Sequence, residues 1–111
     1  MPLPPGLYKI AFTSTDGEDF GVLVLQDGGK LRGGDSGMAY VGTYEQEGDR
    51  LTAQVSVTQH RHMPGVVSVL GFNDIVVEMS GLTKDGAARL RGTSSQVPGV
   101  RFEARLSLIA D

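Results

Sequence analysis

The sequence predicts an all-β domain, folded as an eight-stranded antiparallel up-and-down barrel. Apolar and polar residues alternate in successive short runs, as they do on strands that bury one face. Turns rich in glycine separate these runs. Because an open meander of this length would leave two unpaired edges, we expect the sheet to close into a barrel.

The first half of the chain supplies a lead-in and four strands. Residues 1–5 are a stiff lead-in, because their prolines cannot join a central strand, and residues 6–111 form a single barrel domain. The strands are expected at 6–13, 20–26, 30–32 and 38–44. The second strand is apolar on both faces, with Phe20, Val22 and Val24 on one of them. One face is therefore expected to meet the core and the other a partner or a capping element.

The second half supplies the other strands, expected at 51–58, 74–80, 88–93 and 100–108. The last one alternates most clearly, because polar residues occupy every second position from Arg101 to Ser107 while Leu108 and the apolar residues before it share the other face. The pattern breaks between the fifth and sixth strands. A short apolar segment near 63–70 is either a helical or irregular plug at one end of the barrel or another piece of strand.

Composition narrows the classes of function. The chain has no cysteine, which excludes a disulfide framework, a thiolate metal site and a cysteine nucleophile. Its formal net charge of −3 argues against direct binding of nucleic acid, because such domains usually carry a basic face. The N-terminus lacks the basic and apolar parts of a signal peptide, and no run approaches the ~18 apolar residues of a membrane span. We therefore expect a cytoplasmic protein that does not bind membranes.

No group of residues suggests a reaction. His60 and His62 would share one face of an extended segment, a spacing used by metal ligands, but no third ligand is placed near them, so we expect a solvated loop. The Gly-rich segment 33–37 lacks the helix and the lysine of a phosphate loop, and we expect a tight turn in which Asp35 caps backbone amides. None of the serines considered lies in a nucleophile elbow: Ser14, Ser36, Ser94 and Ser95. We expect no enzymatic activity, no metal and no cofactor.

Two regions remain as candidate sites. The turn from Glu45 to Asp49 is acidic and exposed in any barrel, and it is either a binding surface or a solvated hairpin that aids solubility. The barrel interior either is filled or holds one small apolar or lipid-like ligand, which requires a cavity of about 300 Å³ or more. The residues that would line such a cavity, or else form a plain core, are Tyr8, Phe12, Met38, Tyr40, Tyr44 and Phe102.

Four short motifs occur in the order found in one known family. They are GLYKIAF at 6–12, GVLV at 21–24, GGD at 33–35 and YVG at 40–42. With these motifs the chain resembles the GrlR family, small negative regulators of type III secretion gene expression. The resemblance implies a calycin-like eight-stranded barrel that forms homodimers. It also implies inhibition of a transcription activator by protein–protein binding rather than by binding DNA.

The resemblance also implies a partner-binding site. The family carries an acidic surface motif, and the most similar segment here is Gln46-Glu47-Gly48-Asp49, preceded by Glu45. Only two of the four motif positions, Glu47 and Asp49, are acidic in this chain. The residues that the resemblance assigns to partner binding are Glu45, Gln46, Glu47 and Asp49. The outer side of the second strand would then be a dimer surface.

Overall fold

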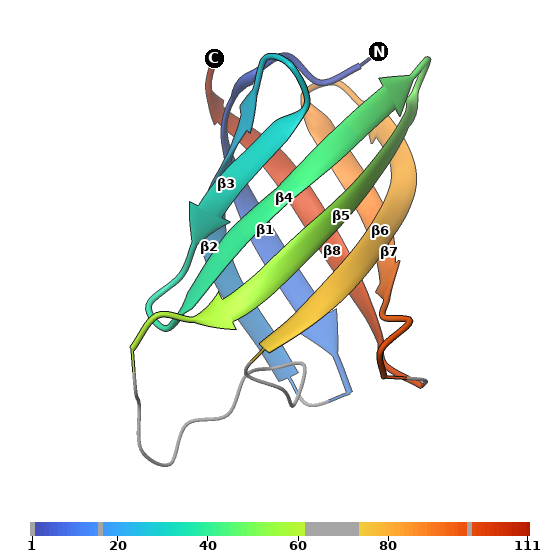
Figure 1. The fold of residues 1–111 in the computed structure, drawn as a ribbon. Coiled ribbons are helices and arrows are strands. Elements are labelled where there is room, and N and C mark those ends of the chain that lie inside the picture. The colour runs from blue at the N-terminus through green and yellow to red at the C-terminus, as the bar shows by residue number, and fades with distance from the viewer. Residues whose placement is uncertain (1, 16, 62–73, 98) are drawn as a thin grey trace.

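The computed structural model describes residues 2–15, 17–61, 74–97 and 99–111 (Figure 1). These residues form eight strands and no helix. The strands are β1 (Gly6–Ser14), β2 (Gly17–Gln26), β3 (Lys30–Gly34), β4 (Met38–Glu47), β5 (Arg50–Gln59), β6 (Asp74–Lys84), β7 (Ala87–Thr93) and β8 (Arg101–Ala110). The predicted plug near 63–70 lies outside the described residues.

Each strand pairs antiparallel with the next one along the chain, and β8 pairs with β1 to close the barrel. This confirms the predicted fold class. Figure 1 shows both chain ends at one end of the barrel, together with the β2–β3, β4–β5 and β6–β7 turns. The β1–β2, β3–β4 and β7–β8 connections lie at the opposite end. We call these the terminal end and the opposite end.

Strand β6 is longer than the sequence pattern suggests. The alternation of its buried residues continues to Lys84, but the residue types reverse near its end, because Leu82 is exposed and Thr83 is buried. Thr83 tolerates burial since its backbone N–H and its hydroxyl both donate to the Asp49 carbonyl, at 2.7 and 3.2 Å. A prediction that assigns apolar residues to the inner face therefore ends this strand at residue 80, whereas β6 continues to Lys84.

Strand β8 departs from the predicted pattern at its C-terminal end. Phe102, Ala104 and Leu106 are buried as expected, whereas Leu108 is 36% exposed. The pairing of β1 with β8 shifts register here, since Tyr8 pairs with Leu108 but Leu7 pairs with Ala110. Such a shift bends the strand and turns its last side chains away from the core.

The barrel interior is packed with aromatic and aliphatic side chains. Phe12 lies at the centre of an aromatic group, with its ring centroid 5.5 Å from that of Tyr40 and 6.0 Å from that of Phe102, both in edge-to-face geometry. Gly92 on β7 makes room for the Phe102 ring, because a Cβ there would lie 2.1 Å from Phe102 Cζ. The missing side chain is thus part of the core packing.

We predict that Gly92→Ala destabilises the fold by about 1–3 kcal/mol, because the Phe102 ring must move within a close-packed core. The free energy of unfolding in urea measures the effect. Phe102→Leu removes the colliding ring atoms, so the double variant should lose less stability than the sum of the two single variants. Strictly additive losses would show that Gly92 and Phe102 are not coupled.

Candidate functional site

The β4–β5 hairpin at the terminal end carries the predicted partner-binding residues. Strand β4 ends at Glu47 and β5 begins at Arg50, and these two residues form the last pair of the ladder. Gly48 has a φ of 60°, a left-handed conformation that glycine adopts without strain, and so permits the tight turn. The Asp49 carbonyl accepts the hydrogen bonds from Thr83 described above, which fasten the turn to β6. The hairpin therefore presents its charges from a braced position.

Strand alternation divides the predicted residues between two faces. Glu45 and Glu47 are exposed and two positions apart, so both lie on the outer face of β4. Gln46 lies between them on the opposite face and is partly buried. The structure therefore brings two of the carboxylates together, with Asp49 exposed in the turn beside them, and separates Gln46 from all three.

Gln46 holds the N-terminal lead-in over the terminal end of the barrel. Its amide donates from Nε2 to the Leu3 carbonyl at 2.9 Å, and the Leu3 N–H donates to its Oε1 at 2.7 Å. The Leu3 side chain is buried in the core, and the Tyr8 hydroxyl donates to the Pro4 carbonyl at 2.5 Å. The side chain of Gln46 is thus engaged within the chain, a contact that no local sequence signal indicates.

A shallow groove lies beside the hairpin on the outer face of β4 to β7. Its volume is about 660 Å³, and hydroxyl, amide and charged side chains line most of it. Glu45 is in this groove, where it pairs across the sheet with Thr52, which in turn pairs with Ser80. The carboxylate of Glu45 therefore borders a surface of mixed polar and apolar character.

The interior offers no space of ligand size among the described residues. The void that they enclose between Ile10, Phe12, Tyr40, Val77 and neighbouring side chains measures about 10 Å³, far below the ~300 Å³ of a small-molecule pocket. Five of the six residues predicted to line a cavity are buried core residues, and Tyr44 packs against them. Their own side chains occupy the space that a ligand would need.

The β3–β4 turn is organised around Asp35, as the sequence predicts. Its Oδ1 accepts hydrogen bonds from the backbone N–H groups of Gly37 and Met38, at 2.9 and 2.8 Å. Its Oδ2 accepts from the Tyr40 hydroxyl at 2.5 Å, a contact that the turn pattern alone does not reveal. Tyr40 reaches this position because Gly21 lacks a Cβ, which would lie 2.9 Å from the hydroxyl oxygen.

Burial in the core raises the pKa of Tyr40 far above its usual value near 10, and the hydrogen bond to Asp35 adds to this shift. Burial also raises the pKa values of Tyr8 and Tyr44. All three phenols are neutral in the folded protein at physiological pH. Their hydroxyls act as hydrogen-bond donors near the ends of the barrel, to Pro4, Asp35 and the Gln26 carbonyl.

His60 of the described chain packs against the β3–β4 turn and contacts its backbone. Its Nε2 lies 3.0 Å from the Asp35 carbonyl oxygen, its backbone N–H donates to the Gly37 carbonyl, and Arg61 Nε donates to the Ser36 carbonyl. His62, the second of the two histidines with metal-ligand spacing, lies outside the described residues. Within the described ranges, no three or more His, Cys, Asp or Glu residues are grouped so as to hold a metal ion.

Comparison with known proteins does not assign the chain to a family. No family model matches the chain, and no curated protein matches it. In the part of the chain that the structure describes, no helix is long and apolar enough to cross a membrane.

We predict that Tyr40→Phe costs about 1–2 kcal/mol of stability at neutral pH, because Asp35 loses a hydrogen-bond donor. The folded pKa of Tyr40 is raised, so the stability that its phenol contributes is fully present below its unfolded pKa of about 10 and is lost as the pH rises above that value. The difference in stability between wild type and variant should therefore shrink between about pH 8 and about pH 11.

Urea unfolding of both proteins across this pH range measures the difference. Tyr8 and Tyr44 are present in both, so their titration cancels. A difference that stays constant with pH would contradict the placement of Tyr40 as a buried donor to Asp35.

Proposed function

We propose that the protein is a non-enzymatic regulator that resembles the GrlR family and acts in the cytoplasm by binding a transcriptional regulator rather than DNA. In this proposal the barrel is a rigid support, and recognition takes place on its outer surface. The filled interior supports a surface role over a small-molecule role, since the described core leaves a void of only about 10 Å³.

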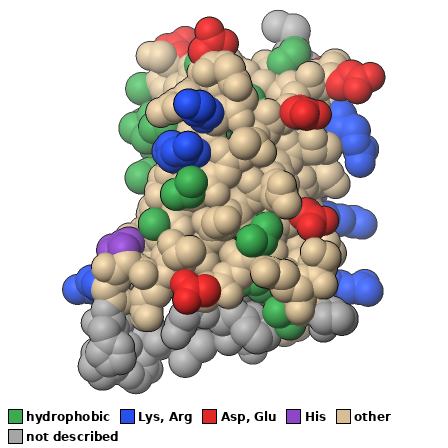
Figure 2. Space-filling model, viewed as in Figure 1, with side chains coloured by type: hydrophobic (Ala, Val, Ile, Leu, Met, Phe, Trp, Pro, Cys, Tyr) green, Lys and Arg blue, Asp and Glu red, His purple; other side chains and the backbone are tan. Residues whose placement is uncertain are grey.

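One observation carries the proposal: Glu45 and Glu47 project together from the outer face of a braced hairpin, with Asp49 exposed in the turn beside them. A strand holds side chains more rigidly than a loop, so less conformational entropy is lost when a partner orders them. Figure 2 shows acidic side chains at the terminal end of the molecule. A basic surface on the regulator would complement this end.

Electrostatic contacts of this kind change the association rate and the choice of partner more than the final affinity. Exposed charges are also screened by salt over a distance of about 8 Å at physiological ionic strength. The proposed complex should therefore form fastest at low salt.

The outer face of β2 and β4 supports the proposed homodimer. Phe20, Val22 and Val41 are between 46% and 51% exposed, and Val24 is half-buried beside them. Arg32 of β3 pairs with both Val24 of β2 and Val41 of β4, so its exposed side chain lies between these two apolar residues. Figure 2 shows hydrophobic side chains along the side of the molecule that carries β2 and β3. Exposed apolar side chains that gather on one side of a protein are typical of contact sites between proteins.

The test of the proposed function is capture from native lysate at low salt, with mass spectrometry to identify what binds. We expect a DNA-binding regulator in stoichiometric amount. Glu45→Gln with Glu47→Gln should weaken its binding about tenfold, because two charges that face the partner are removed.

Asp27→Asn with Asp85→Asn is the matched control, because it removes two charges from the other turns of the terminal end. Asp85 has a φ of 52°, which asparagine also tolerates. The affinity of this control variant for the regulator should stay within about twofold of the wild-type affinity, since only screened long-range attraction changes. Equal weakening by both pairs, or capture of no regulator, would refute the proposed site.

We predict that Val22→Glu converts a dimer into a monomer, because it places a charge in the middle of the exposed apolar face. Sedimentation equilibrium measures the mass. Leu82→Glu introduces the same charge at an exposed leucine on β6 and should leave the dimer intact. A wild-type chain that is monomeric at high concentration would exclude the dimer.

A further inference from the structure

A second groove lies on the outer surface over β6, β7 and β8, and the proposed function does not use it. Its volume is about 270 Å³, close to the lower end for binding pockets. The outward side chains that line it are Leu82 and Lys84 of β6, Ala87 and Arg89 of β7, and Arg105 and Ser107 of β8. Three of these side chains carry a positive charge.

The groove exists because small and large side chains lie in adjoining rows across the sheet. Ala87 pairs directly with Ser107, which leaves a low floor. Lys84 pairs with Ala87 on one side of this floor, and Lys9 of β1 pairs with Ser107 on the other. In the neighbouring row across the sheet, Leu82 pairs with Arg89, and Arg89 pairs with Arg105. Long cationic side chains therefore surround a depression made by two small residues.

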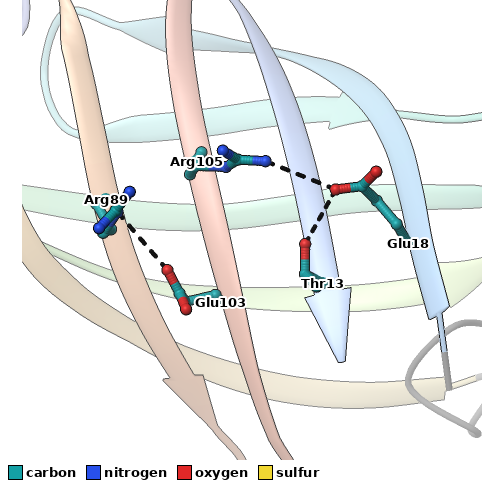
Figure 3. Close-up of polar contacts among 5 residues, drawn as sticks. All are labelled: Thr13, Glu18, Arg89, Glu103 and Arg105. Carbon is teal, nitrogen blue, oxygen red and sulfur yellow. Dashed lines mark hydrogen bonds and ion pairs between the residues drawn. The ribbon is translucent and has the colours of Figure 1, made fainter. Parts of the chain in front are cut away.

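Arg89 and Arg105 are directly opposite each other on neighbouring strands. Like charges in such a position are destabilising unless something compensates them. Each guanidinium leans toward a carboxylate, Arg89 to Glu103 at 3.7 Å and Arg105 to Glu18 at 3.6 Å (Figure 3). Both separations exceed the ~2.7–3.2 Å of an N–H···O hydrogen bond, so these pairs leave guanidinium donors available.

The arginines are exposed as well as loosely paired. The side chain of Arg89 is 74% exposed and that of Arg105 is 54% exposed. Arginine presents several N–H donors in a planar fork that matches a carboxylate with two parallel bonds. A carboxylate held between Arg89 and Arg105 would also relieve their mutual repulsion.

Charge is unevenly distributed over the chain. Strands β7 and β8 carry four arginines and one glutamate, a formal charge of +3, so the rest of the chain carries −6 within the net −3. Figure 2 shows basic side chains along the edge of the molecule where Figure 1 places β6 and β7. The net charge therefore conceals a local basic face.

An apolar wall completes the groove. Leu82 is 65% exposed and pairs with Arg89, so a leucine side chain stands next to the cations. A carboxylate-bearing peptide with an apolar side chain complements both features. A continuous phosphate chain fits less well, because Glu18 and Glu103 lie beside the arginines and the remaining surface is strongly negative.

We propose that this groove binds an acidic segment of a protein partner, with carboxylates between Arg89 and Arg105 and an apolar side chain against Leu82. The site lies on β6 to β8 and does not depend on the acidic hairpin. The protein would then contact partners through two surfaces of opposite charge.

The test uses fluorescence anisotropy of the full chain with a short labelled peptide of alternating glutamate and leucine. We expect saturable binding, and Arg89→Gln with Arg105→Gln should weaken it at least about tenfold, because charge-assisted hydrogen bonds are lost. Arg101→Gln is the matched control, since it removes an exposed arginine of β8 outside the groove. It should change the dissociation constant by less than about twofold.

Further probes separate the alternatives. Leu82→Ser keeps all charges. It should weaken binding of the peptide by about threefold to tenfold, because an apolar contact is lost. Thermal unfolding of each variant confirms that it is folded. The proposal is overturned if the peptide does not bind, if Arg101→Gln weakens binding as much as the double variant, or if a glutamine–leucine peptide binds equally well. Tighter binding of a single-stranded oligonucleotide would instead assign the basic face to nucleic acid.

Discussion

The pairing of β8 with β1 is the constraint on which the rest of the structure depends. It joins the two ends of the meander, so each strand has two neighbours and the sheet has no free edge. Closure also divides every strand into an inner and an outer set of side chains. The inner set forms one continuous core, and the outer set is free to vary without loss of the fold.

The filled core of the described residues is the reason for proposing a function on the outer surface. Aromatic and aliphatic side chains occupy the barrel from the Phe12 cluster outward, and Gly92 is small because Phe102 needs its space. The polar groups of the interior lie near its ends, where Tyr40 donates to Asp35 and Gln46 binds the Leu3 backbone. These contacts close and brace the barrel. The recognition proposed above therefore takes place on the outer surface.

The outer surface is divided into regions of distinct chemistry. Apolar side chains gather on β2 and β4, acidic ones project from the β4–β5 hairpin, and basic ones surround the groove on β6 to β8. Such a division suits a protein that contacts several partners or copies of itself. A surface that served only solubility would intersperse its charges and avoid exposed leucine and phenylalanine.

Period-two alternation predicts the strands, and the Gly-rich segment with Asp35 predicts the turn there. Both depend on residues close together along the chain. The reversal at Leu82 and Thr83 breaks that rule, since a distant carbonyl at Asp49 satisfies the buried threonine. The role of Gln46 and the groove floor at Ala87 and Ser107 depend on contacts between distant segments. These features arise where segments that are far apart in the sequence meet, so no single segment reveals them.

The central claim is that this barrel works through its outer surface. Native mass spectrometry of the protein isolated from its own cells tests it most directly, because it weighs everything that stays bound. The account predicts assemblies whose masses are explained by protein chains alone. A monomer that carries one stoichiometric small molecule would contradict it and place the function inside the barrel.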